Sequence, residues 1–522
     1  MSFKLTYATM FSPPEELHER FEAAMARVRD SLGASHGLYV AGADRAVRAS
    51  TAKHNPADRD ELLGHFAAAT PADADAALRA AHGAWPAWKR TPAHERARLL
   101  RRVGQLLGER VYDIAASLTL EVGKNRLEAL GEAQEAADFF ATYCDDFERA
   151  GGFERALPDD PLTSHASHNR SVLKPYGAWV VITPFNFPIA LAAGPVAAAL
   201  ITGNTVVLKG ATVTPWAGRL LANCIRDAGL PSGVFNYLSG SSAAIGAALV
   251  DHPLTAGVTF TGSYEVGRQI AAKLQSGAYP KPCIAEMGGK NACIVTARAD
   301  LTRAAAGIVR SAFGMGGQKC SALSRLYVDR KVADPLIDSL LAQLTGLAIG
   351  DPARREHWLG PVATASGYED YARYSAGLRS GDARVLSGAA QLKDGALERG
   401  YYVRPTLAEA PVTHSLWQKE MFLPILMVHR VASNEEAMQL ANGSPLGLTA
   451  GFYGAPDEIG WFQEHIEAGV TYANRPQGAT TGAWPGYQPF GGWKGSGTTG
   501  KAIASFYYLP QYLREQSQTV VE

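Results

Sequence analysis

The chain reads GAWVVITPFNFPIALAAGPVAAALITGNTVVLKG over residues 177–210, and this stretch indicates the fold more clearly than any other. A β-rich run at Trp179–Ile182 is followed by an apolar segment of helical length at Ile189–Ile201 and by a second β-rich run at Thr205–Leu208. A strand, a helix and a strand at this spacing are typical of a parallel sheet with crossover helices. We therefore predict an α/β fold around this segment.

The same alternation continues beyond residue 210. We expect further helices at Thr214–Ala228, Ala243–Val250 and Glu265–Leu274, and further strands at Val234–Leu238 and Gly257–Phe260. Nucleotides bind at the carboxyl ends of parallel strands. In this sequence those ends carry Pro184, Lys209, Gly240 and Gly262.

Three other regions complete the predicted organisation. Residues 50–150 read as largely helical, with Ala and Leu stripes and charged faces. A second α/β stretch runs from about residue 287 to 457, with a helix at Ala304–Phe313 and a strand at Arg325–Val328. Residues 474–500 are rich in Gly, Pro and Thr without a regular period, and a loop of that length favours a functional role over a linker.

The bulk composition argues against several classes of protein. At 522 residues the chain should divide into roughly two to four units. Its 50 basic and 50 acidic residues cancel, so we expect neither a nucleic-acid partner nor an anionic membrane surface. The first twenty residues do not resemble a signal peptide, and no apolar run reaches the ~18 residues of a membrane span. Five scattered cysteines without a CxxC pair predict a cytoplasmic protein with neither a disulfide framework nor a metal site.

Three short segments carry the candidate chemistry: PFNFP at 184–188 with Asn186, EMGGK at 286–290 with Glu286, and GGQKCSA at 316–322 with Cys320. Taken singly, a cysteine is an inert core residue by roughly ten to one, an asparagine between prolines is a turn residue, and a strand-end glutamate is a solvated carboxylate. Together, a thiol, a carboxylate base and an amide donor are the parts needed to oxidise an aldehyde through a thioester. We expect Lys319 to help stabilise the thiolate, because it precedes Cys320.

All three segments resemble the signature segments of the aldehyde dehydrogenase superfamily, over most of the chain. The resemblance implies that Cys320 is the nucleophile, that Glu286 activates water, and that Asn186 and the Cys320 backbone N–H hold the oxyanion. It also implies a Rossmann-like cofactor domain, a second α/β catalytic domain and a small β element for homo-oligomers, in which the tail adds an edge strand to a neighbouring subunit. The expected ranges are 1–157 (helical part and start of the cofactor domain), 158–174 (oligomerisation hairpin), 175–286 (cofactor core), 287–473 (catalytic domain), 474–500 (substrate anchor loop) and 501–522 (oligomerisation tail).

The cofactor site implied by this resemblance is that of NAD, with NADP as a possible substitute. FTGS at 260–263, followed by Val266 and Gly267, resembles the superfamily's pyrophosphate turn at a helix N-terminus. Family members that prefer NAD often place a glutamate three residues after the ribose-binding lysine, and this chain has Thr212 there. Without that glutamate, the chain lacks a carboxylate that would repel the 2′-phosphate of NADP. We therefore expect NAD to be preferred only modestly. The implied cofactor residues are Thr183, Pro184, Phe185, Lys209, Gly233, Gly262, Ser263, Gly267, Glu420 and Phe422.

Within the superfamily, GQKCSA at 317–322 and QPFGG at 488–492 resemble the Δ1-pyrroline-5-carboxylate dehydrogenase branch, which oxidises L-glutamate γ-semialdehyde in proline catabolism. That resemblance implies a carboxylate receptor at Ser321, Gly478 and Ala479, an acid near the ammonium at Glu135, and two aromatics, Phe187 and Phe490, around the aliphatic chain. Lys319 joins this substrate set. Residues 480–487 make the anchor loop a few residues longer than is usual, so Trp484 or Tyr487 either reshapes the carboxylate pocket or folds outward.

Two other readings stay open from the sequence. One keeps the chemistry and changes the small-molecule substrate to another semialdehyde or an aliphatic aldehyde. The other is a binding protein that kept the fold and lost catalysis, which the intact Cys320, Glu286 and Asn186 make under roughly one in twenty. On periodicity alone Glu135 would be a solvated helix residue.

Overall fold

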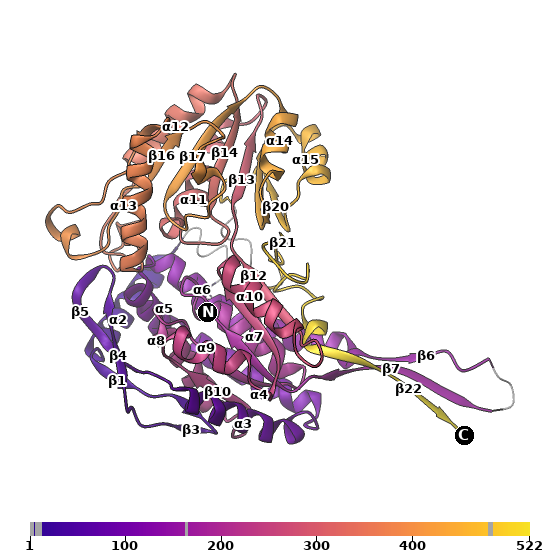
Figure 1. Cartoon of the computed structure of the whole chain (residues 1–522). Helices are drawn as coiled ribbons and strands as arrows, with labels where there is room; N and C mark the ends of the chain where they lie inside the picture. The colour runs from indigo at the N-terminus through magenta and orange to yellow at the C-terminus, as the bar shows by residue number, and fades with distance from the viewer. Residues whose placement is uncertain (1–4, 6–12, 162–164, 479–483) are drawn as a thin grey trace.

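The computed structural model describes residue 5 and residues 13–161, 165–478 and 484–522. Figure 1 shows two α/β units, one above the other, and a β arm that extends away from them. The loops that carry the candidate chemistry lie where the two units meet. Within the described part of the chain, no helix is long and apolar enough to cross a membrane.

The first unit is built on a seven-stranded sheet of order β12-β11-β8-β9-β10-β2-β3. Strands β12 to β10 of this order are mutually parallel, whereas β2 and β3 add antiparallel pairs at one edge. The chain passes from β10 back across to β11 beside β8, so the strand order reverses there and leaves the crevice where α/β proteins bind nucleotides. The bounds are β2 Tyr39–Val40, β3 Ala43–Asp44, β8 Ala178–Ile182, β9 Thr205–Lys209, β10 Phe235–Leu238, β11 Thr255–Gly262 and β12 Cys283–Met287.

Strand β8 shows why this sheet has two covered faces. Trp179 and Val181 pack into one hydrophobic core, and Ala178 and Val180 pack into another, because successive side chains of a strand point to opposite faces. Helices α4 to α8 belong to the first core, and α3, α9 and α10 belong to the second. Their bounds are α2 Glu15–Asp30, α3 Pro71–Trp88, α4 Ala93–Glu109, α5 Val111–Val122, α6 Arg126–Arg149, α7 Ala190–Ile201, α8 Pro215–Asp227, α9 Ser242–Val250 and α10 Tyr264–Gln275.

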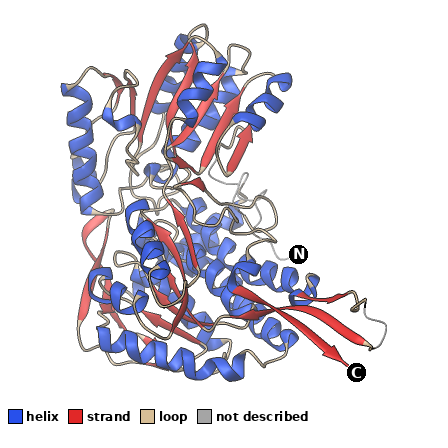
Figure 2. Ribbon diagram, turned by 45° about the vertical axis from the view of Figure 1, so that its right-hand side comes forward, coloured by secondary structure: helices blue, strands red, loops and turns tan. Residues whose placement is uncertain are grey.

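The second unit has a seven-stranded sheet of order β15-β16-β17-β14-β13-β19-β20, parallel except for β15. Helices cover both of its faces (Figure 2). Its strands are β13 Asn291–Val295, β14 Leu323–Asp329, β15 Arg384–Ser387, β16 Thr406–Glu409, β17 Ile425–Val431, β19 Thr449–Tyr453 and β20 Val470–Ala473. Its helices are α11 Leu301–Phe313, α12 Ala333–Thr345, α13 Ala365–Ser380, α14 Asn434–Asn442 and α15 Ile459–His465.

The arm is a three-stranded sheet of order β22-β7-β6, with β6 at Glu154–Leu157, β7 at Ser167–Pro175 and β22 at Leu513–Val521. The tail strand β22 pairs along its full length with β7 of the same chain. The sequence-based expectation had the tail as an edge strand for a neighbour, and here its first partner is its own hairpin. Docking of the arm on another subunit stays a prediction, as do the domain boundaries.

One stretch differs from its predicted structure. Residues 50–67, read as part of a helical region, form the antiparallel hairpin of β4 (Ser50–Asn55) and β5 (Asp58–Ala67), with β1 (Ala34–His36) beside β5. At Gly64 an added Cβ would meet the Ala34 carbonyl oxygen at 2.8 Å, because the backbones approach closely there. The remaining short elements are β18 Leu446–Gly447, β21 Trp493–Lys494, and the 3-10 turns η1 Gly151–Phe153, η2 Gly314–Gly317, η3 Gly395–Arg399, η4 Ser415–Trp417, η5 Pro456–Glu458 and η6 Leu509–Tyr512.

Candidate active site

A tight turn after helix α11 presents Cys320. The backbone is left-handed at three successive residues, Met315, Gly316 and Gly317, with φ of 52°, 64° and 66°. At Gly317 an added Cβ would lie 2.4 Å from the Leu423 carbonyl oxygen, so only glycine fits there. Gly317 of the motif is therefore a requirement of the turn that holds the thiol.

Asn291 fixes this turn from below. Its side-chain Nδ2 donates to the carbonyl oxygens of Cys320 and Ala322 at 2.7 and 2.8 Å. Its Oδ1 accepts from the Thr449 backbone N–H at 2.9 Å, and Thr449 Oγ1 in turn donates to the Ser321 carbonyl at 3.2 Å. The sequence reasoning missed Asn291. Its place directly after EMGGK, at the first position of strand β13, was the available signal.

The thiol of Cys320 is partly exposed and lines a cavity of about 520 Å³. Its pKa is raised to about 12, mainly by burial and then by the nearby carboxyl groups of Glu420 and Glu286, against the backbone N–H groups of Ser321 and Cys320, which lower it. Lys319 Nζ instead pairs with Glu128 Oε1 at 3.2 Å. The charge of Lys319 is therefore shared with Glu128, and its stabilisation of the thiolate stays a prediction.

Glu286 stands at the carboxyl end of β12, opposite Thr261 of β11. It is 9% exposed, and its Oε2 has no hydrogen-bond partner among the described residues. Burial holds the pKa of this carboxyl well above its usual range, although the Gly492 backbone N–H lowers it. Its ionised form is consequently a stronger base than a carboxylate in water.

Asn186 lies on the turn between β8 and α7 and is 2% exposed. Among the described residues none forms a hydrogen bond with its side chain, so the amide is available to a ligand. The turn itself is held by Glu132, whose Oε1 accepts from the backbone N–H groups of Ile189 and Ala190 at 2.9 and 3.3 Å.

A buried ion pair supports this arrangement from helix α6. Glu132 Oε2 lies 2.5 Å from Lys124 Nζ, and both side chains are fully buried. The same ammonium lies 3.5 Å from the centre of the Phe187 ring. Sequence reasoning missed this pair, because nothing local connects residues 124 and 132 with residue 187.

The crevice at the carboxyl ends of β9 and β10 holds Lys209. Its Nζ donates to Ser242 Oγ at 2.7 Å and to Thr212 Oγ1 at 3.2 Å. Burial lowers the pKa of this lysine to about 8, and no carboxylate contributes to the shift. An ammonium with hydroxyl partners in a nucleotide crevice suits a ribose or a phosphate.

The predicted glycines of the crevice serve packing. At Gly262 an added Cβ would lie 2.5 Å from the Phe260 ring, and at Gly267 it would lie 2.4 Å from Met287 Sδ. These glycines let α10 approach the sheet, and Ser263 caps that helix by accepting from the Val266 N–H at 3.4 Å. Thr183 is buried beside them, its N–H donating to the Lys209 carbonyl at 3.3 Å.

Gly233 does not belong to this crevice. It lies five residues before Leu238, the residue of β10 that pairs with Lys209, so it is about 16 Å along the sheet from the Lys209 edge. Its φ is 80°, and an added Cβ would lie 2.6 Å from the Ala80 carbonyl oxygen. Its assignment to the cofactor is wrong. Gly240, at the other end of the strand, occupies the expected edge.

Glu420 and Phe422 bring the second unit to the crevice. Glu420 Oε1 accepts from the Gly289 backbone N–H at 2.9 Å, and burial raises its pKa to about 7. The ring of Phe422 lies 5.6 Å from that of Phe185, which follows Pro184 on the β8–α7 turn. A carboxyl group and two aromatic rings therefore meet on the crevice side of Cys320.

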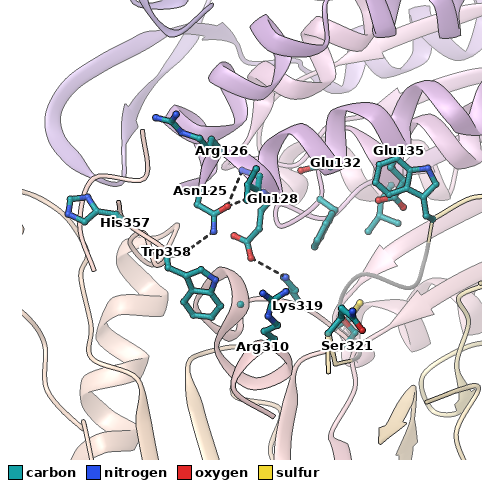
Figure 3. A pocket seen from close by; sticks show the side chains of 18 of the residues that line it. Asn125, Arg126, Glu128, Glu132, Glu135, Arg310, Lys319, Ser321, His357 and Trp358 are labelled. Atoms are coloured by element: carbon teal, nitrogen blue, oxygen red, sulfur yellow. Dashed lines mark hydrogen bonds and ion pairs between the residues drawn. The ribbon is translucent and has the colours of Figure 1, made fainter. Parts of the chain in front are cut away.

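The cavity of Cys320 gathers most of the predicted substrate residues. Figure 3 shows Glu135 on helix α6, Lys319 directed at Glu128, and Ser321 and Arg310 in the cavity wall. Arg310 was not predicted. The predicted residues among those lining the cavity are Glu135, Phe187, Lys319, Cys320, Ser321 and Phe490.

One predicted carboxylate contact, Gly478, is not among the residues that line this cavity. The backbone N–H of Gly478 donates to the Arg475 carbonyl at 3.1 Å, and the residue at the cavity wall is the preceding Gln477. Ala479 lies outside the described residues. Trp484 lines the cavity, while Tyr487 is 77% exposed, so the longer loop turns one of its aromatics inward and the other outward.

Glu135 is partly buried beside two other acids of helix α6. The pKa of its carboxyl is raised to about 8, mainly by burial and then by Glu132 and Asp138, while Lys124 lowers it. Among the described residues none hydrogen-bonds to this side chain. A carboxyl of this kind becomes ionised when a cation binds beside it.

Comparisons with known proteins agree with this geometry. Residues 43–517 match the model of the aldehyde dehydrogenase family. The 1-pyrroline-5-carboxylate dehydrogenase of Geobacillus thermodenitrificans is 37% identical over 515 residues, which cover 97% of this chain and 96% of that protein. The 1-pyrroline-5-carboxylate dehydrogenase 2 of Bacillus subtilis is 37% identical over 511 residues, with 97% and 96% covered.

Solved structures agree as well. A 1-pyrroline-5-carboxylate dehydrogenase from Thermus with bound NAD superposes with a TM-score of 0.92 at 34% identity, covering 100% of this chain and 99% of the other. The predicted two-unit α/β fold is thereby confirmed. The match extends over both units and the loops between them, and the chain therefore belongs to the aldehyde dehydrogenase family.

Proposed function

We propose that this chain oxidises L-glutamate γ-semialdehyde, the open form of Δ1-pyrroline-5-carboxylate, to L-glutamate with NAD(P), as a step of proline catabolism. The observation that carries the proposal is the cavity at Cys320, whose lining combines the Cys320 thiol with the Glu135 carboxyl group and the Arg310 guanidinium. An aldehyde that also bears an ammonium and a carboxylate matches those charges. The relatives named 1-pyrroline-5-carboxylate dehydrogenase support the same substrate.

The reaction begins at the thiol. Cys320 gives its proton to the ionised form of Glu286, and the sulfur bonds to the aldehyde carbon. The Asn186 amide and the Cys320 backbone N–H stabilise the resulting oxyanion, an effect of about 3 to 4 kcal/mol per donor. When bound, the oxidised nicotinamide ring supplies the acceptor for the hydride of that carbon, and a thioester to Cys320 remains.

Hydrolysis returns the protein to its starting state. After Glu286 has released its proton to solvent, its carboxylate removes a proton from a water molecule, whose oxygen bonds to the thioester carbon. The carbon–sulfur bond breaks, the proton taken up by Glu286 passes to the Cys320 sulfur, and glutamate departs. The raised pKa of Glu286 favours both proton transfers.

Residues of the crevice fit the dinucleotide. Lys209 and Ser242 would hold the adenosine ribose, the amino end of α10 at Ser263 would face the pyrophosphate, and Glu420 with Phe422 would hold the nicotinamide ribose and ring. The preference for NAD over NADP is modest. Thr212 has a hydroxyl at the position where a carboxylate would repel the 2′-phosphate of NADP. Its hydroxyl is shared with Lys209, the Gly240 carbonyl and Ser242.

The charged end of the substrate meets residues of both units. Ser321 donates to the α-carboxylate, with Lys319 and Arg310 adding positive charge, and Glu135 receives the α-ammonium. Phe187 and Phe490 pack against the aliphatic chain. The sequence suggested that backbone N–H groups bind the α-carboxylate. The Gly478 N–H already donates to the Arg475 carbonyl, so side chains contribute more of the carboxylate contacts.

A panel of aldehydes tests the proposal. The substrates are L-glutamate γ-semialdehyde, its desamino analogue 5-oxopentanoate, succinic semialdehyde and pentanal. In the wild type we expect kcat/KM to be highest for the first, and Ser321→Ala to lower it roughly 10- to 150-fold for the first two, the range of a charge-assisted hydrogen bond. Pentanal should change less than about threefold. An equal loss of kcat/KM with pentanal would leave only a general aldehyde dehydrogenase activity. A higher wild-type kcat/KM for succinic semialdehyde would make that compound the proposed substrate instead of L-glutamate γ-semialdehyde.

The arm suggests a homo-oligomer. It projects from the body (Figures 1 and 2), and its edge strands β6 and β22 carry the exposed apolar side chains Leu157, Val520 and Val521. Such edges are sites of pairing with another chain. Light scattering of the full chain and of a version lacking residues 513–522 tests this. An unchanged oligomer mass would show that the tail does not hold the subunits together. A cytoplasmic location stays a prediction from the cysteine usage.

A further inference from the structure

The longer anchor loop ends in a turn that directs its two aromatic side chains to different sides. Residues 484–487 are Trp-Pro-Gly-Tyr, and the Tyr487 N–H donates to the Trp484 carbonyl at 3.0 Å. Gly486 has a φ of 85°. Proline at the second position and a left-handed glycine at the third are typical of a type II turn. This turn directs the Trp484 side chain into the cavity and leaves Tyr487 in solvent.

The Trp484 indole is anchored to helix α6. Its Nε1 donates to Asp138 Oδ2 at 2.6 Å. The other carboxylate oxygen of Asp138 accepts from Gln134 Nε2 at 2.9 Å, so both oxygens are occupied and the carboxylate cannot rotate freely. These hydrogen bonds restrain the Asp138 carboxylate and, through Nε1, the indole ring at the cavity wall.

Three acids follow one another on this part of helix α6, and two of them are already engaged. Glu132 is paired with Lys124, and Asp138 is bound to Trp484 and Gln134. Glu135, three residues before Asp138, lines the cavity with no hydrogen bond to another described side chain. A cation that enters here meets the Glu135 carboxyl group, which has no hydrogen-bond partner among the described residues, and the Trp484 side chain in the lining of the same cavity.

We infer that Trp484, positioned by Asp138, joins Glu135 in a subsite for the α-ammonium of the substrate and so selects α-amino semialdehydes over their desamino analogues. Aromatic faces attract ammonium groups through the ring quadrupole, and indole is the strongest of them. The inference rests on the proposed function and deepens it, because it assigns the ammonium contact to a residue of the longer loop. Asp138 acts through the indole and is a positioning residue.

The experiment compares L-glutamate γ-semialdehyde with 5-oxopentanoate, which differs from it only by the amino group. The quantity measured is the ratio of the two kcat/KM values. Trp484→Ala should lower this ratio about 3- to 30-fold, the range of a desolvated cation–π contact, through a raised KM for the amino substrate. Trp484→Phe keeps an aromatic face and should retain more of the ratio than Trp484→Ala. Tyr487→Ala, in the same turn but exposed, is the matched control and should leave the ratio within about twofold.

The outcomes separate this inference from the proposed function. A wild-type ratio near one would overturn the proposed function itself, because no ammonium would then be recognised. A high wild-type ratio that Trp484→Ala leaves unchanged, or a loss equal for both substrates, would overturn the inference alone. If the ratio falls as far with Trp484→Phe as with Trp484→Ala, the aromatic face does not bind the ammonium.

Discussion

Replacing Glu135 with glutamine makes the ammonium contact measurable through pH. The carboxyl has a raised pKa of about 8 in the free protein, so it is mostly neutral at pH 7. An ammonium binds to its ionised form, and binding therefore releases a proton. The affinity for the amino substrate therefore rises with pH up to about pH 8. Below that pH it falls about tenfold per pH unit.

The size of the effect follows from two opposing terms. A hydrogen bond to a charged group contributes about 1.5 to 3 kcal/mol, whereas ionising a carboxyl one pH unit below its pKa costs about 1.4 kcal/mol. At pH 7 the remainder is about 0.1 to 1.6 kcal/mol, so Glu135→Gln should lower kcat/KM for L-glutamate γ-semialdehyde by at most about 15-fold. At pH 9 the cost disappears and the loss should reach about 10- to 150-fold.

The assay follows reduced cofactor by absorbance from pH 6 to 9, for the wild type and the variant on the same substrate solution. Opening of the pyrroline ring depends on pH, and so do Cys320 and Glu286. These contributions are common to both proteins and cancel in the ratio of wild-type to variant kcat/KM. The matched control is 5-oxopentanoate, for which this ratio should stay near one.

Either of two results would refute the reasoning. A ratio that does not rise between pH 6 and pH 9 would show that Glu135 is already ionised or does not contact the substrate. A ratio that rises equally for 5-oxopentanoate would show that the titrating carboxyl acts on the shared chemistry.

Four further predictions concern catalysis, coenzyme and stability. Cys320→Ala should abolish oxidation while NAD binding, measured by fluorescence titration, stays near the wild-type value; more than a few per cent of the activity would mean another nucleophile. Glu286→Gln should give a burst of reduced cofactor and a slow steady state in stopped flow, because thioester hydrolysis loses its base, and wild-type turnover would remove Glu286 from the mechanism. Thr212→Glu should lower kcat/KM for NADP more than for NAD, whereas an unchanged ratio would place Thr212 away from the 2′ position. Glu132→Ala leaves the Lys124 ammonium buried without its partner and should cost roughly 3 to 5 kcal/mol in denaturant unfolding; a loss below about 1 kcal/mol would mean that water replaces the carboxylate.

The sequence by itself determined the sheet of the first unit and the segments that carry the chemistry. The alternation around Trp179 and Val181 is local, because a strand that is covered on both faces must be apolar at every position. The segments that hold Asn186, Glu286 and Cys320 are likewise short and contiguous, whereas the left-handed turn at Gly316 and Gly317 was found only in the structure. Where local signals were weak the prediction failed: residues 50–67 form a hairpin, and Gly233 lies at the wrong end of its strand.

The tertiary structure alone decided the charges and the shape of the cavity. Lys319 precedes Cys320 in sequence, yet its ammonium pairs with Glu128, 191 residues away. Trp484 points inward because Asp138, 346 residues away, accepts its N–H. A pKa or an ion pair depends on distance and burial in three dimensions, and neither is encoded in the order of neighbouring residues, whereas hydrophobic periodicity is.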